Sequence, residues 1–524
     1  MKKFVVHELL RHTLVNRPDS EIVSGRVRLT YETMYERILR LADRLGRLGI
    51  GRGTVVGVMD VNSHRYLELH YALSMLGAVI HTLNFRLSGE DLAYTIRHAE
   101  DEWLFVWDGF AEAAKPLHRL VPNWVWLSDS VEGPEPQALT YEGLVEEGRA
   151  TEPQSADAVD ETTPYSLFYT TGTTGRPKGL LYRHRDILWA SLQMAHHLAL
   201  HRTGASMKSD DVFMPLIPFF HIHGWGTTMF VPYLGSNLVL PGRSGPREQL
   251  ELIRREGVTW CNMVPTQLQM LLGELEEGET LPLKVLTGGS PLPAGLARRA
   301  RERGVSYSLI YGGSDQLGAS IAVVPEGMDL ASPEADQILA TRMRAMPMVE
   351  IEVRAKAGNL VPRDGKTIGE VWVRSPWLPS GYYKDPERSK ESYVDGWFRS
   401  GDLAVRHPDG TLQVVDREKD AVKSGGEWIP CGVLESVLSE HPQVEAAAVV
   451  AKPDERWGER PLAVVQTRAP VKEEELRAYL EEKVKEGRLA KFWVPDDFVF
   501  VKDFPVTSAG KVHKAALRER LGLA

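Results

Sequence analysis

Residues 169–179 carry the densest run of anion-binding groups in the chain: Tyr169, Thr170, Thr171, Gly172, Thr173, Thr174, Gly175, Arg176, Pro177, Lys178 and Gly179. Glycines let a backbone approach an oxyanion and turn its N–H groups inward, while threonine hydroxyls donate further hydrogen bonds. An arginine and a lysine add positive charge. The loop follows an apolar run at 165–169, predicted to be a buried strand, and precedes a helix predicted from residue 186 onward. This arrangement is typical of a polyphosphate site.

The spacing differs from the GxxxxGK[ST] phosphate loop, because Pro177 precedes the lysine and Gly179 follows it. A solvated glycine and threonine turn is the structural alternative. Three glycines at three- and four-residue intervals, with hydroxyls between them, favour phosphate binding.

Composition limits the classes of protein to which the chain can belong. A length of 524 residues predicts more than one domain, and 43% hydrophobic with 25% charged residues is typical of a soluble globular protein. The net charge of −9 argues against nucleic acid as a partner. Two cysteines, Cys261 and Cys431, form no disulfide framework, and Met1-Lys2-Lys3 begins no secretory signal. We therefore expect a cytoplasmic protein.

The segment 212–242 contains no Asp, Glu, Lys or Arg, which by itself would suggest a membrane helix. Pro215, Pro218 and Pro232 interrupt it together with two histidines, and both residue types disfavour a helix in lipid. We predict a strand, a loop and a second strand that line a cavity, so no membrane span, although peripheral membrane contact stays open.

Hydrophobic periodicity predicts helices at 31–48 and 66–77 and buried strands at 54–59, 78–83 and 104–107. Strands that alternate with amphipathic helices predict an α/β fold of layered, largely parallel sheets.

Three further runs supply candidate site residues. The run 219–226 predicts a cavity wall with Phe220, His221, Trp225 and Gly226, although its phenylalanines could be plain core and its two histidines lack a third metal ligand nearby. At 285–290 and 308–315 glycines stand where apolar strands end, which is where open α/β sheets bind ligands. There the backbone would meet one face of a flat base and the tyrosine ring the other, while the serine and aspartate would point toward phosphate and its metal. The candidates in these two runs are Gly288, Gly289, Ser290, Tyr311, Gly312, Gly313, Ser314 and Asp315.

The eleven residues at 169–179 resemble the phosphate loop of the adenylate-forming superfamily. That superfamily holds acyl- and aryl-CoA synthetases, the adenylation domains of peptide synthetases, and luciferases. Matching motifs continue in the family's order through 311–315, 396–402 and 416–420 to the turn at 505–511, so the resemblance covers nearly the whole chain. Within the superfamily, the sequence most resembles the bacterial fatty acyl-CoA synthetases. The sequence differs from the family pattern at Ser314 and Asp315, where the family has threonine and glutamate, and at 342–347.

The resemblance implies ATP, Mg²⁺ and coenzyme A as the bound molecules. Residues 170–178, with Thr170, Thr171, Gly172, Thr173, Thr174, Gly175 and Lys178, would hold the β- and γ-phosphates. Thr170 and Asp315 would face the metal. Asp402 would accept both ribose hydroxyls, and Arg417 would touch ribose and phosphate. Lys511, in the terminal turn, would be the lysine that catalyses adenylation.

The resemblance also implies two domains. Residues 1–416 would form the large N-terminal domain, 417–420 the hinge with Lys419, and 421–524 a small mobile α+β domain. Rotation about the hinge would withdraw Lys511 and bring a glycine turn alongside the pantetheine arm of CoA. Its residues would be Lys423, Gly425 and Gly426, with Trp428 near the substrate pocket. A homodimer is a family expectation.

The expected activity is ATP-dependent conversion of a carboxylic acid to an acyl adenylate and then to acyl-CoA, with release of AMP and pyrophosphate. The pocket wall at 219–226 with Gly312 and Gly313 offers no fixed charge, which disfavours an amino acid, whose ammonium group requires a carboxylate. A medium- or long-chain fatty acid is the predicted substrate, with Trp225 as a candidate gate. Alternatives are an aromatic or other acid, a free-standing amino-acid adenylation enzyme, and a catalytically silent nucleotide-binding protein.

Overall fold

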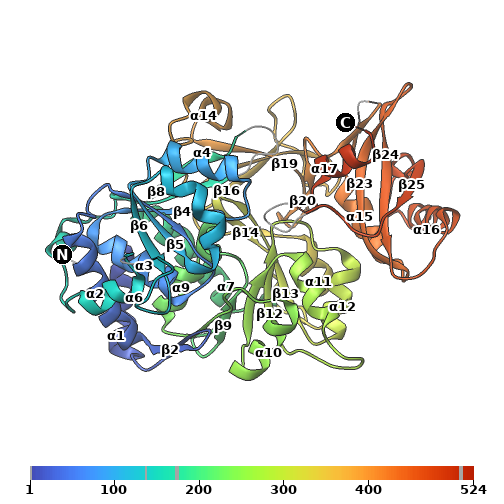
Figure 1. Ribbon diagram of the computed structural model, residues 1–524. Helices are drawn as coiled ribbons and strands as arrows, with labels where there is room; N and C mark the ends of the chain where they lie inside the picture. Colours follow the sequence, from blue (N-terminus) through green and yellow to red (C-terminus); the bar gives the residue numbers. More distant parts are fainter. Residues whose placement is uncertain (1–2, 136–137, 171–175, 426, 507–511, 524) are drawn as a thin grey trace.

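The computed structural model describes residues 3–135, 138–170, 176–425, 427–506 and 512–523. The chain forms a large body from its first four-fifths and a smaller one from its C-terminal hundred residues, drawn in red and orange at the right of Figure 1. An α/β fold with a small C-terminal unit agrees with the prediction.

The first sheet of the large body has six strands, five of them parallel and the last antiparallel. Its parallel strands are apolar and mostly buried, as expected for a sheet covered on both faces. In spatial order the strands are β6 (Asn123–Leu127), β5 (Trp103–Trp107), β3 (Val55–Met59), β4 (Val79–Thr82), β7 (Pro164–Thr170) and β8 (Lys178–Arg183).

The second sheet has nine strands and supplies the central wall of the large body. Parallel pairing runs from β1 to β13, and the three outer pairs are antiparallel. The spatial order is β15 (Arg344–Ala345), β14 (Leu317–Ile321), β13 (Ser306–Gly313), β12 (Lys284–Gly288), β11 (Trp260–Met263), β9 (Val212–Pro215), β10 (Asn237–Leu240), β1 (Glu21–Ser24) and β2 (Val27–Thr30).

Two antiparallel sheets complete the architecture. The third belongs to the large body and holds β16 (Glu350–Arg354), β17 (Gly369–Arg374), β19 (Trp397–Arg406), β18 (Tyr393–Val394) and β20 (Leu412–Arg417). The fourth is the centre of the small body, with one parallel pair at its edge, and holds β22 (Glu427–Ile429), β21 (Val422–Ser424), β24 (Gly458–Thr467), β23 (Val444–Asp454) and β25 (Asp497–Phe500).

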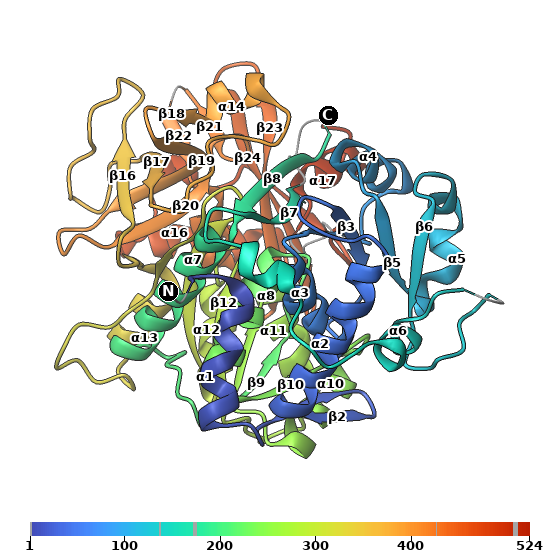
Figure 2. The same ribbon diagram turned by 90° about the vertical axis from the view of Figure 1, so that its left-hand side faces the viewer.

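Helices cover these sheets, and the view in Figure 2 shows α2, α3 and α7 lying in the large body with α16 and α17 beyond. The helices of the large body are α1 (Leu9–Asn16), α2 (Tyr31–Arg47), α3 (His64–Leu76), α4 (Gly89–Ala99), α5 (Ala111–Ala114), α6 (Tyr141–Glu147), α7 (His184–Leu200), α8 (Ile222–Trp225), α9 (Thr227–Leu234), α10 (Pro246–Glu256), α11 (Pro265–Gly273), α12 (Ala294–Glu302), α13 (Pro333–Thr341) and α14 (Pro386–Ser392). Those of the small body are α15 (Cys431–Ser439), α16 (Glu473–Lys485) and α17 (Lys514–Arg520). None of the helices within these described ranges is long and apolar enough to cross a membrane.

Helix α2 begins at the predicted Tyr31 and ends one residue before the predicted end, whereas α3 begins at His64, two residues before the predicted start. The hydroxyl of Thr30 caps α2 by accepting a hydrogen bond from the N–H of Thr33. The side chains at 34, 38, 41 and 45 are fully buried, so the predicted face is the packed one. Gly77 ends α3 with φ of 67°, a conformation that glycine adopts without strain.

The prediction that the phosphate loop leads directly into a helix was wrong. Strand β8 intervenes and pairs antiparallel with β7, so that Thr170 lies opposite Lys178. Strands β7 and β8 are therefore the two strands of a hairpin, and residues 171–175 between them lie outside the described residues. Leu180 and Tyr182 are buried and Leu181 between them is less so, a strand pattern that the glycine at 179 obscured.

The prediction for 212–242 was half right. Strands β9 and β10 stand at its two ends, but the middle contains α9, which runs through Pro232. Proline lacks the N–H that would bond the carbonyl four residues earlier, that of Thr228. The hydroxyl of Tyr71 donates to that carbonyl at 2.7 Å, so the freed acceptor is satisfied and the helix persists.

Candidate active site

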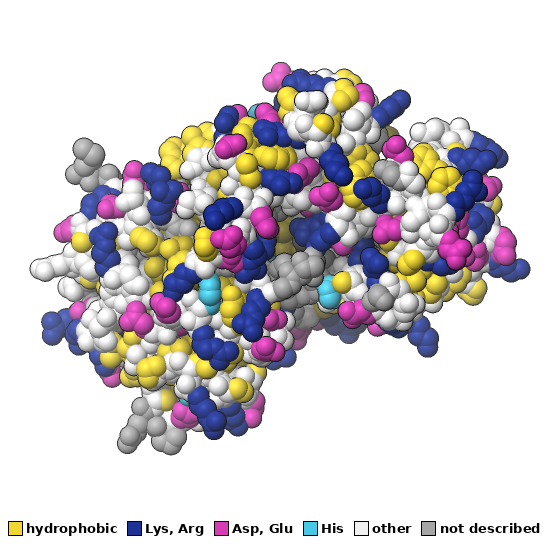
Figure 3. Space-filling view, turned by 90° about the horizontal axis from the view of Figure 1, so that it is seen from above, with side chains coloured by type: hydrophobic (Ala, Val, Ile, Leu, Met, Phe, Trp, Pro, Cys, Tyr) yellow, Lys and Arg dark blue, Asp and Glu magenta, His cyan; other side chains and the backbone are white. Residues whose placement is uncertain are grey.

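A cavity of about 1760 Å³ lies where the two bodies meet. The hollow is visible in Figure 3 between the larger part of the surface and the smaller part at the right. Its walls come from the carboxyl ends of β12 and β13, from one face of α7, from β19 and β20, and from α15. The edge of the second sheet where its parallel strands end is thus a wall of this cavity, as predicted for an α/β sheet.

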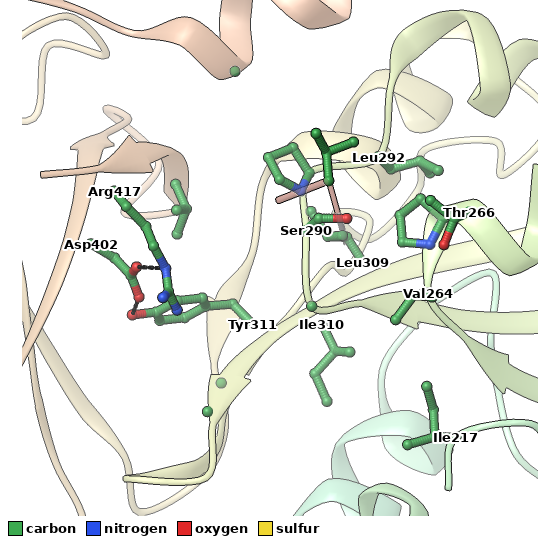
Figure 4. A pocket seen from close by; sticks show the side chains of 18 of the residues that line it. Ile217, Val264, Thr266, Ser290, Leu292, Leu309, Ile310, Tyr311, Asp402 and Arg417 are labelled. Carbon is green, nitrogen blue, oxygen red and sulfur yellow. Dashed lines mark hydrogen bonds and ion pairs between the residues drawn. The ribbon is translucent and has the colours of Figure 1, made fainter. Parts of the chain in front are cut away.

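Three polar side chains form one group on one side of this cavity, as Figure 4 shows. The Tyr311 hydroxyl donates to Asp402 Oδ2 at 2.8 Å, and Arg417 Nε lies 3.1 Å from Asp402 Oδ1. The N–H of Asp402 donates to Ser400 Oγ, which fixes the strand at this point. The carboxylate raises the pKa of Arg417, and burial raises the pKa of Tyr311, so the first stays charged and the second stays protonated. The group presents a carboxylate and a cation side by side.

A second polar group joins the hairpin tip to the end of β13. Lys178 Nζ donates to the hydroxyl of Tyr382 at 3.1 Å, and that hydroxyl donates to Asp315 Oδ1 at 2.7 Å. The backbone beside Asp315 is also held, because Tyr182 donates to the carbonyl of Ser314 and Tyr393 to that of Asp315. A cation and a carboxylate therefore face the cavity at a fixed separation.

One branch of the cavity is apolar. Helix α7 contributes Ile187, Ala190 and Met194, and the segment after β9 contributes Ile217 and Trp225. In Figure 4 Ile217 and Ile310 lie away from the polar group that Asp402 and Arg417 make. No Asp, Glu, Lys or Arg occurs at 187–194 or 217–226. This branch suits an uncharged chain.

Residues 222–226 form a left-handed turn in the wall of that branch. The φ angles run from 41° at Ile222 to 76° at Gly226, and all five residues are positive. Each non-glycine residue in this region costs about 1–2 kcal/mol. Buried hydrogen bonds hold the turn: His223 Nε2 bonds with Ser166 Oγ at 2.7 Å, and Asn262 Nδ2 donates to the carbonyl of Gly224 at 2.8 Å. Burial lowers the pKa of His223 to about 3, so it bonds as a neutral ring.

The small body closes the cavity from the side opposite β13. Helix α15 packs on α12, where the N–H groups of Ala294 and Gly295 donate to Ser436 Oγ and Ser439 Oγ, each at 3.2 Å. Val506 and Val512 of the small body line the cavity.

Most of the predicted site residues that the structure describes line this one cavity. They are Thr170, Lys178, His221, Trp225, Gly226, Gly289, Ser290, Tyr311, Gly312, Gly313, Ser314, Asp315, Asp402, Arg417 and Lys419. The predicted residues Thr171, Gly172, Thr173, Thr174, Gly175, Gly426 and Lys511 lie outside the described residues.

Five described residues of the prediction do not line the cavity. Phe220 packs against Phe85 behind its wall. Gly288 lies beneath it, where a Cβ would come within 2.5 Å of the Ile310 carbonyl. Lys423, Gly425 and Trp428 belong to the β21–β22 hairpin of the small body, and a Cβ on Gly425 would meet the ring of Trp457 at 3.0 Å.

Two parts of the site were missed from the sequence. Tyr382 stands in a stretch of ordinary composition before α14, and only the fold brings it to Lys178 and Asp315. The serines at 436 and 439 are three apart on a short helix, a spacing that marks one face but no partner.

Comparison with known proteins agrees with this geometry. A family model described as AMP-binding enzyme matches residues 10–383, and a model of the AMP-binding enzyme C-terminal domain matches residues 433–511. The chain belongs to the AMP-binding enzyme family. The second match falls within the small body, and the first ends inside the large one.

Two curated relatives illustrate the family. A long-chain-fatty-acid–CoA ligase of Thermus thermophilus is 37% identical over 96% of this chain and 92% of its own length. A medium-chain-fatty-acid–CoA ligase of Ectopseudomonas oleovorans is 32% identical over 99% of this chain and 96% of its own. The solved structure of the anthranilate CoA ligase AuaEII in complex with anthranoyl-AMP matches with a TM-score of 0.86 at 21% identity, over 99% of this chain and 98% of that one. That last likeness shows the fold.

Proposed function

We propose that this family member activates a medium- or long-chain fatty acid as an acyl adenylate and transfers the acyl group to coenzyme A. The observation that carries the proposal is the composition of the one cavity. It holds a carboxylate–cation pair, a separate lysine–aspartate pair, an apolar branch and a segment of the small body. Two relatives with the fatty acid–CoA ligase name support the same conclusion.

In the first half-reaction, the substrate carboxylate oxygen would attack the α-phosphorus of ATP, and the bond to the β-phosphate oxygen would break to release pyrophosphate. The protein's task is positioning and charge stabilisation. Asp402 would accept the ribose hydroxyls, with Arg417 holding that carboxylate in place. Lys178 would neutralise the terminal phosphates. Gly289 and Tyr311 would lie on the two faces of the base.

Lys511 would bridge the substrate carboxylate and the α-phosphate. It lies outside the described residues, but Val506 and Val512 on either side of its turn line the cavity, which supports that role in the arrangement seen here. The residues that would approach CoA, Lys423 and Gly425, do not line the cavity.

In the second half-reaction, the CoA sulfur would attack the acyl carbon, and the bond from that carbon to the AMP oxygen would break. We infer that the small domain, residues 421–524, rotates about a hinge at 417–420 between the two steps. Lys419 lines the cavity at the point where β20 leads into the small body, which suits a hinge. The glycine turn at 425 would then replace Lys511, with Trp428 nearer the acyl group.

Mg²⁺ fits this site as a partner of ATP. Asp315 is the carboxylate that lines the cavity beside Lys178, and Thr170 adds a hydroxyl. Among the described residues no group of three or more His, Cys, Asp and Glu could hold a metal alone. Mg²⁺ usually keeps several waters and is held by one or two carboxylates plus phosphates, so one aspartate is adequate. The ion would offset phosphate charge.

The cytoplasmic location and the assembly of the protein both remain proposals. Both cysteines are free and buried, which agrees with a reducing cytoplasm. Assembly as a homodimer stays a prediction.

Release of AMP with a panel of acids tests the proposed function. Octanoate, palmitate, cinnamate and a mixture of amino acids would each be supplied with ATP, Mg²⁺ and with or without CoA. CoA-dependent turnover that is highest with a fatty acid is the expected result. A preference for cinnamate would indicate an aryl acid as the substrate. ATP–pyrophosphate exchange that depends on an amino acid and needs no CoA would indicate an adenylation enzyme. Nucleotide binding without turnover would contradict catalysis.

A further inference from the structure

The loop between β17 and α14, together with α14 itself, contacts the β7–β8 hairpin at two points. The N–H of Tyr383 donates to the carbonyl of Gly179 at 2.8 Å, which makes an antiparallel bridge onto β8. Arg388 Nη1 donates to the carbonyl of Arg176 at 3.0 Å. Two backbone positions of the hairpin, 176 and 179, are thus held by a segment some 200 residues later in the chain. This loop is in position to set the geometry of Lys178 between them.

Tyr382 is the residue of this loop that enters the cavity wall. Its side chain is 6% exposed, and its own N–H donates to Ser389 Oγ at 2.8 Å, so the residue is fixed from behind. The ammonium of Lys178 lies 4.4 Å from the centre of its ring and 3.1 Å from its hydroxyl oxygen. The ring and the hydroxyl therefore act together on one cation.

The same hydroxyl has a second partner on the opposite side. It donates to Asp315 Oδ1 at 2.7 Å, a charge-assisted hydrogen bond. Burial and the neighbouring Asp315 raise the pKa of Tyr382, so the phenol keeps its proton near neutral pH and can donate. One oxygen thus joins Lys178 to Asp315.

The link through the Tyr382 hydroxyl matters because neither the Lys178 nor the Asp315 side chain is fixed by itself. Lys178 has a long flexible stem, and losing its rotamer freedom costs about 1.5–2 kcal/mol. The backbone of Asp315 is held by the hydroxyl of Tyr393, but of its side-chain oxygens Oδ1 takes its hydrogen bond from Tyr382. Asp315 itself lines the cavity.

We propose that Tyr382 is a positioning residue of the adenylation half-reaction, whose hydroxyl holds the Lys178 ammonium and the Asp315 carboxylate at the separation that the magnesium–triphosphate requires. The inference rests on the proposed function. It assigns a role to a residue outside the motifs that predicted the site. A tyrosine at this place keeps the cation and the carboxylate from pairing directly, which would withdraw both from the ligand.

Tyr382→Phe removes the hydroxyl and keeps the ring with its contact to Lys178. We expect the kcat of acid-dependent ATP–pyrophosphate exchange to fall by about 10- to 100-fold, the range for removal of a group that orients a catalytic charge. The Mg²⁺ concentration for half-maximal exchange should rise several-fold, because Asp315 loses its fixed rotamer. The KM for the fatty acid should stay within twofold, since the apolar branch is untouched.

Tyr383→Phe is the matched control. It is the adjacent residue, its ring packs against His98, and its backbone bond to Gly179 remains. Exchange, Mg²⁺ requirement and melting temperature should all match the wild type. If Tyr382→Phe lowers the melting temperature and exchange in parallel with an unchanged Mg²⁺ requirement, the residue is structural and the inference is wrong.

A double-variant cycle tests the connection to Asp315. In an Asp315→Asn background, the further change Tyr382→Phe should reduce exchange by less than threefold, because residues that act through one bond are not additive. Full additivity would overturn the inference. Failure of the wild-type protein to exchange pyrophosphate with any acid would instead overturn the proposed function, so the two failures are distinguishable.

Discussion

The nucleotide side of the cavity and the interface between the two bodies are built differently. On the nucleotide side, residues from β13, β19 and β20 meet through direct side-chain bonds, with Tyr311, Asp402 and Arg417 at the centre. These strands belong to sheets whose cores are continuous and buried. At the interface, α15 meets α12 through two serine hydroxyls and a glycine contact. The proposed domain rotation would leave the first region assembled and would separate the second, including the Arg299–Glu445 ion pair between the bodies.

The chain segment that joins the bodies has features of both regions. Asp416 accepts hydrogen bonds from the N–H of Arg417 and from that of Cys431, each at 2.7 Å, and so caps the start of α15 across the hinge. Lys514 pairs with Glu435 at 2.8 Å nearby. The bond from Cys431 to Asp416 thus ties the start of α15 to the end of β20, whereas the Lys514–Glu435 pair lies within the small body.

The largest effect is expected from Lys511→Ala. Adenylate formation, followed by ATP–pyrophosphate exchange, should fall by about 10²- to 10³-fold, because a charge that stabilises the transition state is lost. Thioester formation from supplied acyl adenylate should change by less than threefold, since that step uses the other face of the small domain. Intact exchange would show that the interface brings no catalytic group to the cavity.

Asp402→Asn tests the nucleotide side of the cavity. The KM for ATP should rise by about 10-fold or more, because a neutral amide accepts the ribose hydroxyls less strongly and Arg417 loses its partner. Both half-reactions use the same nucleotide site, so both should weaken. Asp409→Asn is the control, an exposed aspartate in the turn after β19, and should leave the steady-state KM unchanged. An effect confined to one half-reaction would contradict the comparison.

Gly295→Ala tests the interface between the two bodies. A Cβ at 295 would lie 2.0 Å from the carbonyl oxygen of Ser439, so α15 must move away from α12. Overpacking costs about 1–3 kcal/mol, which predicts a decrease of about 10-fold in exchange with thioester formation from supplied adenylate unchanged. Gly273→Ala, in open space at the end of α11, is the control. A parallel loss in both half-reactions would mean that this contact serves both orientations.

The smallest effect concerns pH. Burial lowers the pKa of His197, in the large body, to about 4, against about 6.5 in an unfolded chain. The unfolded state then binds more protons between these values, so the stability that the neutral ring contributes above pH 6.5 is lost as pH falls toward 4. The unfolding free energy of wild type relative to His197→Gln should fall by about 1.4 kcal/mol per pH unit in this range.

Urea unfolding at pH 7 and at pH 5 measures this difference. His441→Gln is the matched variant in the small body, where the ring is only half-buried and burial lowers its pKa. Its difference from wild type should vary less with pH. If the unfolding free energy relative to wild type changes with pH equally for the two variants, then the large body does not pack its histidine more tightly than the small body does.

Much of this architecture could be predicted because local patterns are strong where packing is simple. The helix at 31–47 has a regular apolar face and a threonine cap, and the parallel strands are plain apolar runs. We missed strand β8 and helix α9 because each needs a contact with another part of the chain to form. Strand β8 needs β7 beside it, and α9 needs the Tyr71 hydroxyl to satisfy the carbonyl that Pro232 leaves without its helical hydrogen bond.

The sequence by itself determined the fold class, the family, and the identity of the charged and glycine residues that meet in the cavity. The fold class follows from hydrophobic periodicity along the chain, whereas the family and most of the site residues follow from the resemblance of the ordered motifs to a known superfamily. Only the tertiary structure decided that Tyr382 joins Lys178 to Asp315, that five residues at 222–226 adopt left-handed backbone, and that Ser436 and Ser439 cap α12. Each of those depends on groups that folding brings together from distant parts of the chain. A local sequence pattern cannot predict which distant residue will be the partner.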